Sequence, residues 1–146
     1  SYLPVLNALF ALHEGDAAKA VACADVAAPY ETAAPGTAFP AGGAAFFGAL
    51  YPTYARGLAL SRLGRHREAA DEFQKILNHY CLTLNDPIGP LSRLQLSRTL
   101  SACGETARAV TVYESLLANW QNADPDSPTV IQARAEAELA RRESSR

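Results

Sequence analysis

Residues 51–80 carry two apolar helical patterns on either side of Gly64, and this arrangement predicts two packed helices. Before the glycine, apolar side chains recur at helical spacing at Tyr54, Leu58, Leu60 and Leu63. After the glycine they recur at Ala69, Ala70, Phe73, Ile76 and Leu77. A glycine at this point permits the left-handed backbone that commonly ends a helix. Such a hairpin leaves an apolar face uncovered, so similar hairpins are expected on either side of it.

Side-chain size within residues 51–80 predicts how closely the two helices approach. Gly57 on the first helix and Ala69 on the second are small enough to allow a close contact. Phe73 is then expected to fill the space between this hairpin and its neighbour. The hairpin, expected to span about residues 47–80, therefore supplies both a close helix contact and a large side chain for the core.

Residues 2–28 predict a first hairpin of the same kind. Its first helix ends at Gly15 and has an apolar stripe formed by Leu3, Leu6, Leu9, Phe10 and Leu12. Asp16 is expected to cap the second helix by accepting hydrogen bonds from its free backbone N–H groups. Pro29 is expected to end that helix, whose packed positions are Ala20, Ala24 and Ala27.

Residues 87–122 predict a third hairpin, which turns at Gly104. Asp86 is expected to cap its first helix, with Pro87 at the first helical position. The apolar residues of that first helix are Leu91, Leu94, Leu96 and Leu100. Trp120 ends the hairpin and is expected to pack on the C-terminal segment of the chain.

Residues 127–142 predict a last helix, capped by Asp126 or Ser127 and opened by Pro128. The side chains expected to face the third hairpin are Val130, Ile131, Ala133, Ala137 and Leu139. The expected outer face carries Arg134, Glu136, Glu138, Arg141 and Arg142. A terminal helix with a polar outer face suits the end of a helical array.

Two connections interrupt this pattern, at residues 29–46 and 81–90. The first contains three prolines and three glycines, which exclude a regular helix over most of it. Two interpretations stay open: a plain loop, or an ordered strap with Tyr30 and Phe39 packed against the hairpins. The next helix is expected to begin either near Ala44 or at Pro52.

Composition supports a single all-α domain spanning residues 1–146. The chain is 49% hydrophobic, much of it alanine, and shows no sustained alternating pattern typical of strands. The net charge of the chain is −2, which argues against nucleic acid as a partner, because a basic face is the usual footprint of nucleic-acid binding. The sequence contains no run of about twenty apolar residues, so no segment is predicted to insert into a membrane. Since the chain contains no methionine, we expect it to be a fragment of a larger protein.

Several segments resemble the C-terminal tetratricopeptide region of large bacterial proteins, mostly acidobacterial. These segments are LYPTYARGLALSRLG, EFQKIL, LNDPIG, GETARAVTVYESLLANW and NADPDSP. The positions that match the repeat signature are Gly57, Gly64, Ala69 and Phe73. The proteins that the chain resembles carry a serine/threonine protein kinase domain or a winged-helix regulator at their other end. The resemblance implies a superhelix of three hairpins plus a capping helix, acting as an interaction or sensing module.

Motifs that would indicate catalysis or a cofactor are not found in the sequence. It contains no glycine-rich phosphate loop and no kinase catalytic motif, so an enzyme and a bound cofactor are not expected. Three histidines and three cysteines are present, but their spacings do not match those of metal sites. Cys23 and Cys103 are instead expected to be small buried residues.

In the tetratricopeptide fold, the first helix of each hairpin lines a concave groove. This rule assigns as peptide-groove candidates Tyr51, Tyr54, Leu58, Arg62, Leu94 and Arg98. Matching positions elsewhere are Tyr2, Val5, Leu9 and Leu91. A surface that is aromatic at one end and cationic at the other suits a peptide with apolar and acidic residues. The competing interpretation is that several of these residues belong to the core.

The sequence supports two functional hypotheses. The first is a non-catalytic module that binds a protein or peptide ligand within a kinase or regulator. The second is a structural or oligomerising spacer without a groove ligand, which would make the chain part of a homo-oligomer. A cytoplasmic location is favoured, with an extracytoplasmic one if a membrane segment precedes the fragment.

Overall fold

A computed structural model describes residues 2–32, 50–83 and 86–145. Over these residues the chain is all-helical and contains no strand. The helices are α1 (Tyr2–His13), α2 (Ala17–Asp25), the 3-10 turn η1 (Ala28–Tyr30), α3 (Tyr51–Arg62), α4 (His66–Asn78), α5 (Tyr80–Thr83), α6 (Ile88–Ala102), α7 (Thr106–Asn119) and α8 (Pro128–Ser144). None of these described helices has the length and apolar character needed to cross a membrane. The all-α prediction is confirmed for this part of the chain.

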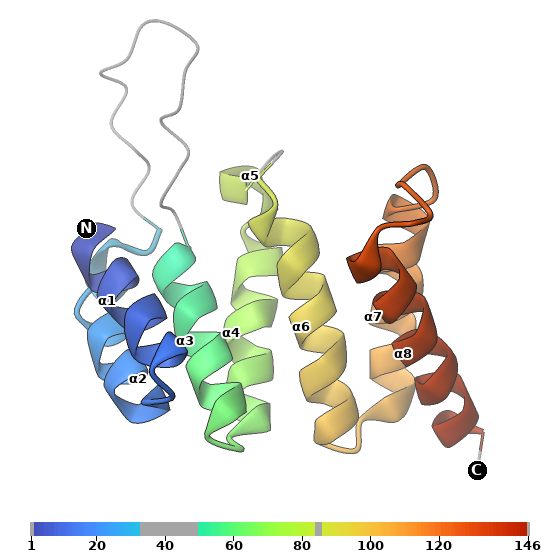
Figure 1. The fold of residues 1–146 in the computed structure, drawn as a ribbon, viewed down its shortest axis with the longest axis horizontal. Helices are drawn as coiled ribbons and strands as arrows, with labels where there is room; N and C mark the ends of the chain where they lie inside the picture. The colour runs from blue at the N-terminus through green and yellow to red at the C-terminus, as the bar shows by residue number, and fades with distance from the viewer. Residues whose placement is uncertain (1, 33–49, 84–85, 146) are drawn as a thin grey trace, which may run out of the picture.

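The seven long helices follow one another in a row from the N-terminal to the C-terminal end of the molecule, and in this view α1 overlaps α2 and α7 overlaps α8 (Figure 1). Each long helix packs on the next, and α3 also contacts α1 and α6. Successive helices alternate in direction, so the short glycine turns all lie at the same edge of the row (Figure 1). The short helix α5 lies in the second connection and was not predicted. Helix α3 begins at Tyr51, and the alternative start near Ala44 lies outside the described residues, as does Phe39.

The three glycine turns share one conformation. Gly15, Gly64 and Gly104 have φ of +84°, +74° and +80°, as expected for residues that end helices in the left-handed region. At the second turn, the N–H of Gly64 donates to the Ser61 carbonyl at 3.1 Å, and that of Arg65 donates to the Leu60 carbonyl at 2.9 Å. This pair of bonds is the Schellman motif, which satisfies carbonyls at the helix end. The other two turns repeat the same bond pattern.

We expect Gly64→Ala to lower the free energy of unfolding by about 1 kcal/mol, because a Cβ is strained at positive φ. A Cβ at this position would contact nothing within 4 Å, so the loss would come from the backbone alone. Urea unfolding followed by circular dichroism measures it. Gly64→Asn is the matched control and should lose less, since asparagine tolerates this conformation. Equal stability of wild type and Gly64→Ala would contradict the turn assignment.

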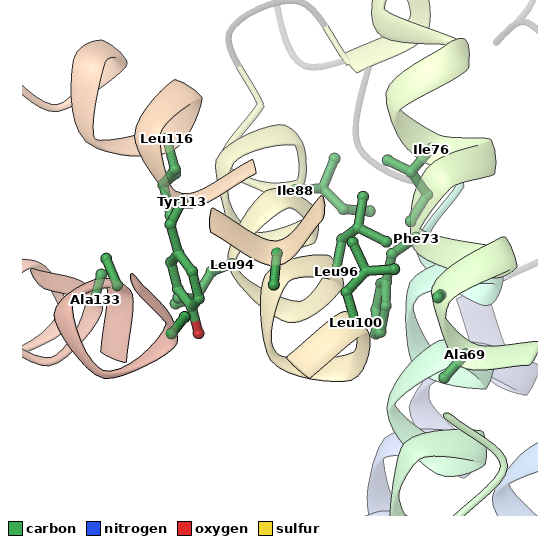
Figure 2. Packing of buried hydrophobic residues seen from close by; sticks show 14 of the residues in the cluster. Ala69, Phe73, Ile76, Ile88, Leu94, Leu96, Leu100, Tyr113, Leu116 and Ala133 are labelled. Atoms are coloured by element: carbon green, nitrogen blue, oxygen red, sulfur yellow. The ribbon is translucent and has the colours of Figure 1, made fainter. Parts of the chain in front are cut away.

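The larger core cluster extends from α3 to α8, and Phe73 of α4 is one of its largest members. Phe73 is fully buried, and Figure 2 shows its ring beside Leu96 and Leu100 of α6. On the other side, a Cβ added to Gly57 would lie only 2.8 Å from this ring. The predicted roles of Gly57 and Phe73 are therefore confirmed: the glycine lets α3 approach α4, and the ring fills the space toward α6.

Gly57→Ala should destabilise the protein by about 1 kcal/mol or more, although alanine favours helices by about 1 kcal/mol. The added methyl group would clash with a ring that the core holds in place, and overpacking typically costs about 1–3 kcal/mol. Gly89→Ala is the control, because its Cβ would meet its nearest atom, the Thr83 Oγ1, at 3.7 Å. Urea unfolding should show the control unchanged or slightly more stable. A stabilised Gly57→Ala would show that α3 and α4 are not in close contact.

The ends of the helices follow the sequence with three differences, of which the first is that α6 begins at Ile88, with Pro87 just before its first helical position and not in it. Asp16 caps α2 by accepting from the Lys19 N–H at 2.9 Å, and Asp86 accepts from the Ile88 N–H at 2.9 Å. Ser127 occupies the position before α8, but its side chain makes no capping bond. Pro29 does not end α2, which stops at Asp25; the proline instead lies in the 3-10 turn after that helix.

The predicted apolar stripe of α1 is mostly on the outside. Of its members only Leu12 is buried, whereas Leu3, Leu6, Leu9 and Phe10 are 68%, 50%, 41% and 65% exposed. The buried face of α1 is formed instead by small residues, Ala8 and Ala11. They join a cluster with Ala20 and Ala24 of α2 and with Ala55 and Ala59 of α3. Alanine faces bring these helices so close that the larger side chains are directed outward.

The last helix shows the same effect. Its buried residues are Val130, Ala133, Ala137 and Ala140, so Val130, Ala133 and Ala137 face the core as predicted. Ile131 and Leu139 are 53% and 58% exposed, so their predicted contact with the third hairpin is wrong. Glu136 was predicted on the outer face, but it is half-buried and hydrogen-bonded to α6 and α7. Alanine at the contact again decides which face turns inward.

Candidate functional site

The six groove candidates lie on two adjacent helices. Tyr51, Tyr54, Leu58 and Arg62 follow one another on α3, three or four residues apart, and therefore share a face of it. Leu94 and Arg98 share a face of α6, which contacts α3. Leu94 is only 2% exposed and belongs to the main core cluster, so it cannot contact a ligand. The other five are half-buried or exposed.

Tyr51 ties the start of α3 to the start of α6. Its hydroxyl donates to Oδ1 of Asp86 at 2.9 Å, the same oxygen that accepts from the backbone of α6. Burial and the neighbouring Asp86 carboxylate raise the pKa of Tyr51 to about 12. The hydroxyl therefore stays protonated near neutral pH and is already committed to a partner within the chain. Only the ring of Tyr51 remains for a ligand.

Tyr54 and Leu58 form the centre of the candidate surface. The Tyr54 ring meets the Phe73 ring edge to face, with centroids 5.7 Å apart. Burial raises the pKa of the Tyr54 hydroxyl. Leu58 is half-buried and packs against both hydrophobic clusters. Both side chains therefore contribute to stability as well as to the surface.

Arg98 joins α6 to α8. Its guanidinium makes two bonds to the Glu136 carboxylate, Nε to Oε2 at 2.9 Å and Nη2 to Oε1 at 3.0 Å. The hydroxyl of Tyr113 on α7 donates to the same Oε2 at 3.0 Å, and burial strongly raises the pKa of this tyrosine. Three helices therefore meet at one carboxylate. This pairing neutralises part of the cationic character that the sequence predicted for the surface.

Arg62 is exposed, and its Nη1 donates to the backbone carbonyl of Leu12 in the last turn of α1. Its partner thus lies on α1, whereas the partner of Arg98 lies on α8. The two arginines are engaged with opposite neighbours. Among the matching positions, Leu9 and Leu91 are 41% and 37% exposed, and Val5 is half-buried.

A buried charge cluster, which sequence reasoning missed, lies between α2, α3 and α4. Arg56 is 8% exposed and pairs with Glu31 at 2.5 Å and with Glu72 at 2.7 Å. Glu31 is 2% exposed and also accepts from Lys75 at 2.6 Å. Arg56 further contacts the exposed Asp25 at 3.3 Å. An arginine flanked in sequence by Ala55 and Gly57 was the available signal.

Glu31 also closes the first connection. Its carbonyl accepts from the N–H of Leu50 at 3.0 Å, so the chain leaves and rejoins the helical row at one point. Burial acts to raise the pKa of its carboxyl group, but the Lys75 hydrogen bond and the Arg56 charge outweigh burial and hold it below 4.5. The ionised form is therefore the stabilising one. The role of this cluster is structural, since every charge in it has a partner.

Glu31→Gln should lower the free energy of unfolding by about 1–3 kcal/mol at pH 7, because buried charge-assisted bonds are removed. Since the folded pKa lies below 4.5, the wild-type advantage should hold above that pH and shrink as pH falls through the folded pKa. Urea unfolding at several pH values measures the difference between the two proteins. Glu68→Gln, which removes an exposed pair with Arg65, is the control and should leave stability unchanged. A constant difference down to pH 3 would contradict this assignment.

Within the described ranges, no group of three or more His, Cys, Asp or Glu side chains could hold a metal ion. The three cysteines are free thiols. Cys23 and Cys103 are half-buried rather than buried as predicted, and Cys81 is exposed.

Six of the eleven exposed large hydrophobic side chains among the described residues lie at the N-terminal end of the row, between residues 3 and 30. One pocket of about 360 Å³ is lined by Leu6, Leu9, Phe10 and His13 of α1. A second, of about 280 Å³, is lined by Pro4, Val26, Ala27 and Tyr30. This end of the protein thus presents apolar hollows to solvent.

No family model matches this sequence, and neither a curated protein nor a solved structure was found to match it. The functional argument therefore depends on the geometry of the chain itself.

Proposed function

We propose that this chain is a non-catalytic tetratricopeptide-like module that binds a protein or peptide, as part of a larger bacterial signalling protein such as a serine/threonine kinase. The observation that carries the proposal is the shared face of Tyr51, Tyr54, Leu58 and Arg62 on α3. All four remain at least partly exposed, and Leu91 of α6 is exposed as well. Tyrosine and arginine are the residue types that most often dominate binding energy between proteins.

Three features support a tetratricopeptide-like superhelix of three hairpins and a further helix. Each of the first three helix pairs turns through a glycine with the same Schellman bonds. Within the central pair, Gly57 contacts the Phe73 ring, which fits the small and large positions of the repeat signature. Each pair also packs on the next one along the chain. In this proposal α8 is the closing helix.

The second hypothesis, a structural or oligomerising spacer, draws support from other contacts of the same residues. Arg98 is paired with Glu136, the Tyr51 hydroxyl with Asp86, and Leu94 is buried. These contacts leave fewer free polar groups than a dedicated peptide site would offer. The two hypotheses differ in whether the face of α3 has a ligand.

The substitutions that test the groove have to avoid residues that hold the fold. Tyr54 and Arg98 are the candidates suggested by sequence, but Tyr54 packs on Phe73 and Arg98 joins α6 to α8. Their replacement by alanine is therefore expected to lower stability together with binding. Arg62 and Leu91 are exposed and better suited; Arg62 donates only to a backbone carbonyl of α1, that of Leu12, and pairs with no charged side chain among the described residues.

Peptides selected from a displayed random library against the wild-type chain should be rich in acidic and apolar residues. Arg62→Glu and Leu91→Glu should weaken the binding of these peptides by about tenfold or more in fluorescence anisotropy. The first variant reverses a charge, and the second puts a carboxylate where an apolar side chain met the peptide. Melting temperatures should stay within about 2 °C of wild type.

Arg134→Glu and Ile131→Glu are the matched controls, because both residues are exposed on α8. They should bind as wild type does. Failure to select any peptide, or equal weakening by test and control variants, would favour the spacer hypothesis.

A further inference from the structure

The outward face of α1 is mostly apolar, and none of the described residues covers it. Leu3, Leu6 and Phe10 are 68%, 50% and 65% exposed and lie on one side of the helix, with Leu9 at its edge. Of the eleven exposed large hydrophobic side chains among the described residues, six lie between residues 3 and 30, so the exposure is concentrated rather than scattered. We call Leu3, Leu6 and Phe10 the α1 stripe. A concentrated apolar surface of this kind commonly marks an interaction site.

Counting residues back from the turn glycines shows which positions of α3 and α6 correspond to the α1 stripe. Phe10 stands five residues before Gly15, as Ala59 stands before Gly64 and Thr99 before Gly104. Ala59 and Thr99 are 0% and 1% exposed, and their helices are packed by the preceding helices α2 and α4. Counted in the same way, Leu3 and Leu6 match Pro52 and Ala55 on α3, which are both buried, and Ser92 and Gln95 on α6, of which Ser92 is buried and Gln95 half-buried. The α1 stripe therefore corresponds to the face of α3 and of α6 on which the preceding helix packs.

The stripe has the charge and spacing needed to pair with itself. The segment from Tyr2 to Leu12 contains no charged side chain, so two copies of α1 would meet without like-charge repulsion. Positions 3, 6, 7 and 10 are symmetric about the midpoint between 6 and 7, so the exposed Asn7 of one copy would stand opposite Leu6 of the other. In an antiparallel pairing, Leu3 of one copy therefore meets Phe10 of the other, and Leu6 lies near the two-fold axis.

The exposed area is also of the required order. The α1 stripe, Leu9 and the nearby Val26 and Tyr30 together expose on the order of 600 Å², at the upper end for a patch on a typical monomer. A standard interface buries about 800 Å² on each partner, and surrounding polar atoms add to the apolar area. The pocket between Leu6, Leu9 and Phe10 offers a hollow for a side chain of the other copy.

We propose that the α1 stripe binds the α1 stripe of a second copy, so that the chain forms a two-fold symmetric dimer through antiparallel α1 helices. This surface is centred on the outer side of α1 and is separate from the candidate peptide surface on α3. Dimerisation and peptide binding are therefore distinct properties, and each can be abolished without the other.

Sedimentation equilibrium of the wild-type chain between about 1 and 200 μM should show a monomer–dimer equilibrium with a dissociation constant in the micromolar range, as for small interfaces. Leu6→Glu should weaken the dimer by at least about a hundredfold, because two carboxylates would be brought together at the axis. Phe10→Glu should do the same. Both residues are at least half exposed, so circular dichroism spectra and melting temperatures of the variants at low concentration should match the wild-type monomer.

Ile131→Glu is the matched control, since Ile131 is an apolar residue 53% exposed on α8 at the far end of the row. It should leave the dimer intact, and so should Arg62→Glu on the peptide surface. A wild-type chain that stays monomeric at 200 μM would overturn the proposal, and the stripe would then belong to a different helix. A dimer that survives both stripe variants, or one that Ile131→Glu abolishes, would overturn it as well.

Discussion

Close approach between neighbouring helices is the constraint on which the rest of this structure depends. Where two helices meet, one of them presents glycine or alanine: Gly57 faces the Phe73 ring across α3 and α4, and alanines line the contacts among α1, α2 and α3. Small residues bring backbones together, and dispersion contacts then accumulate over many atoms. Because small side chains occupy the helix contacts, the large apolar side chains are found in only two kinds of location. They fill the main core beside α6, or they project into solvent.

The polar contacts inside the row depend on the same closeness. Arg56 stands among alanines, so its guanidinium is withdrawn from water and requires Glu31 and Glu72 as partners. Arg98, Tyr113 and Glu136 repeat this arrangement at the other end, where one carboxylate serves two donors from two other helices. Both clusters connect three elements at once. These two clusters fix the relative orientation of neighbouring helices. Alanine packing alone would define that orientation less well.

Much of this fold could be predicted from the sequence, because its signals are local. The glycine turns, the Asp16 cap and the place of Phe73 each depend on a few neighbouring residues and on standard helix geometry. The outward direction of Leu3 and Phe10, and the burial of Glu136, depend on which face of a helix meets its neighbours. Hydrophobic periodicity assigns the largest apolar residues to that face, whereas here alanine occupies it. Of the candidate surface, the shared face on α3 was predictable, but the burial of Leu94 and the pairing of Arg98 were not, since both arise from α7 and α8.

The backbone hydrogen bond between Leu50 and Glu31 makes the geometry of the helices independent of the length of the connection between these two residues. With the N–H of Leu50 at 3.0 Å from the Glu31 carbonyl, the chain can depart and return at one point whatever number of residues lies between. The cost of closing a loop grows only slowly with its length. This point on the protein is therefore suited to accept an inserted tag or a whole inserted domain, with the helical row acting as a fixed scaffold beside it. In natural variants of the chain, changes in length are expected to accumulate there rather than at the glycine turns.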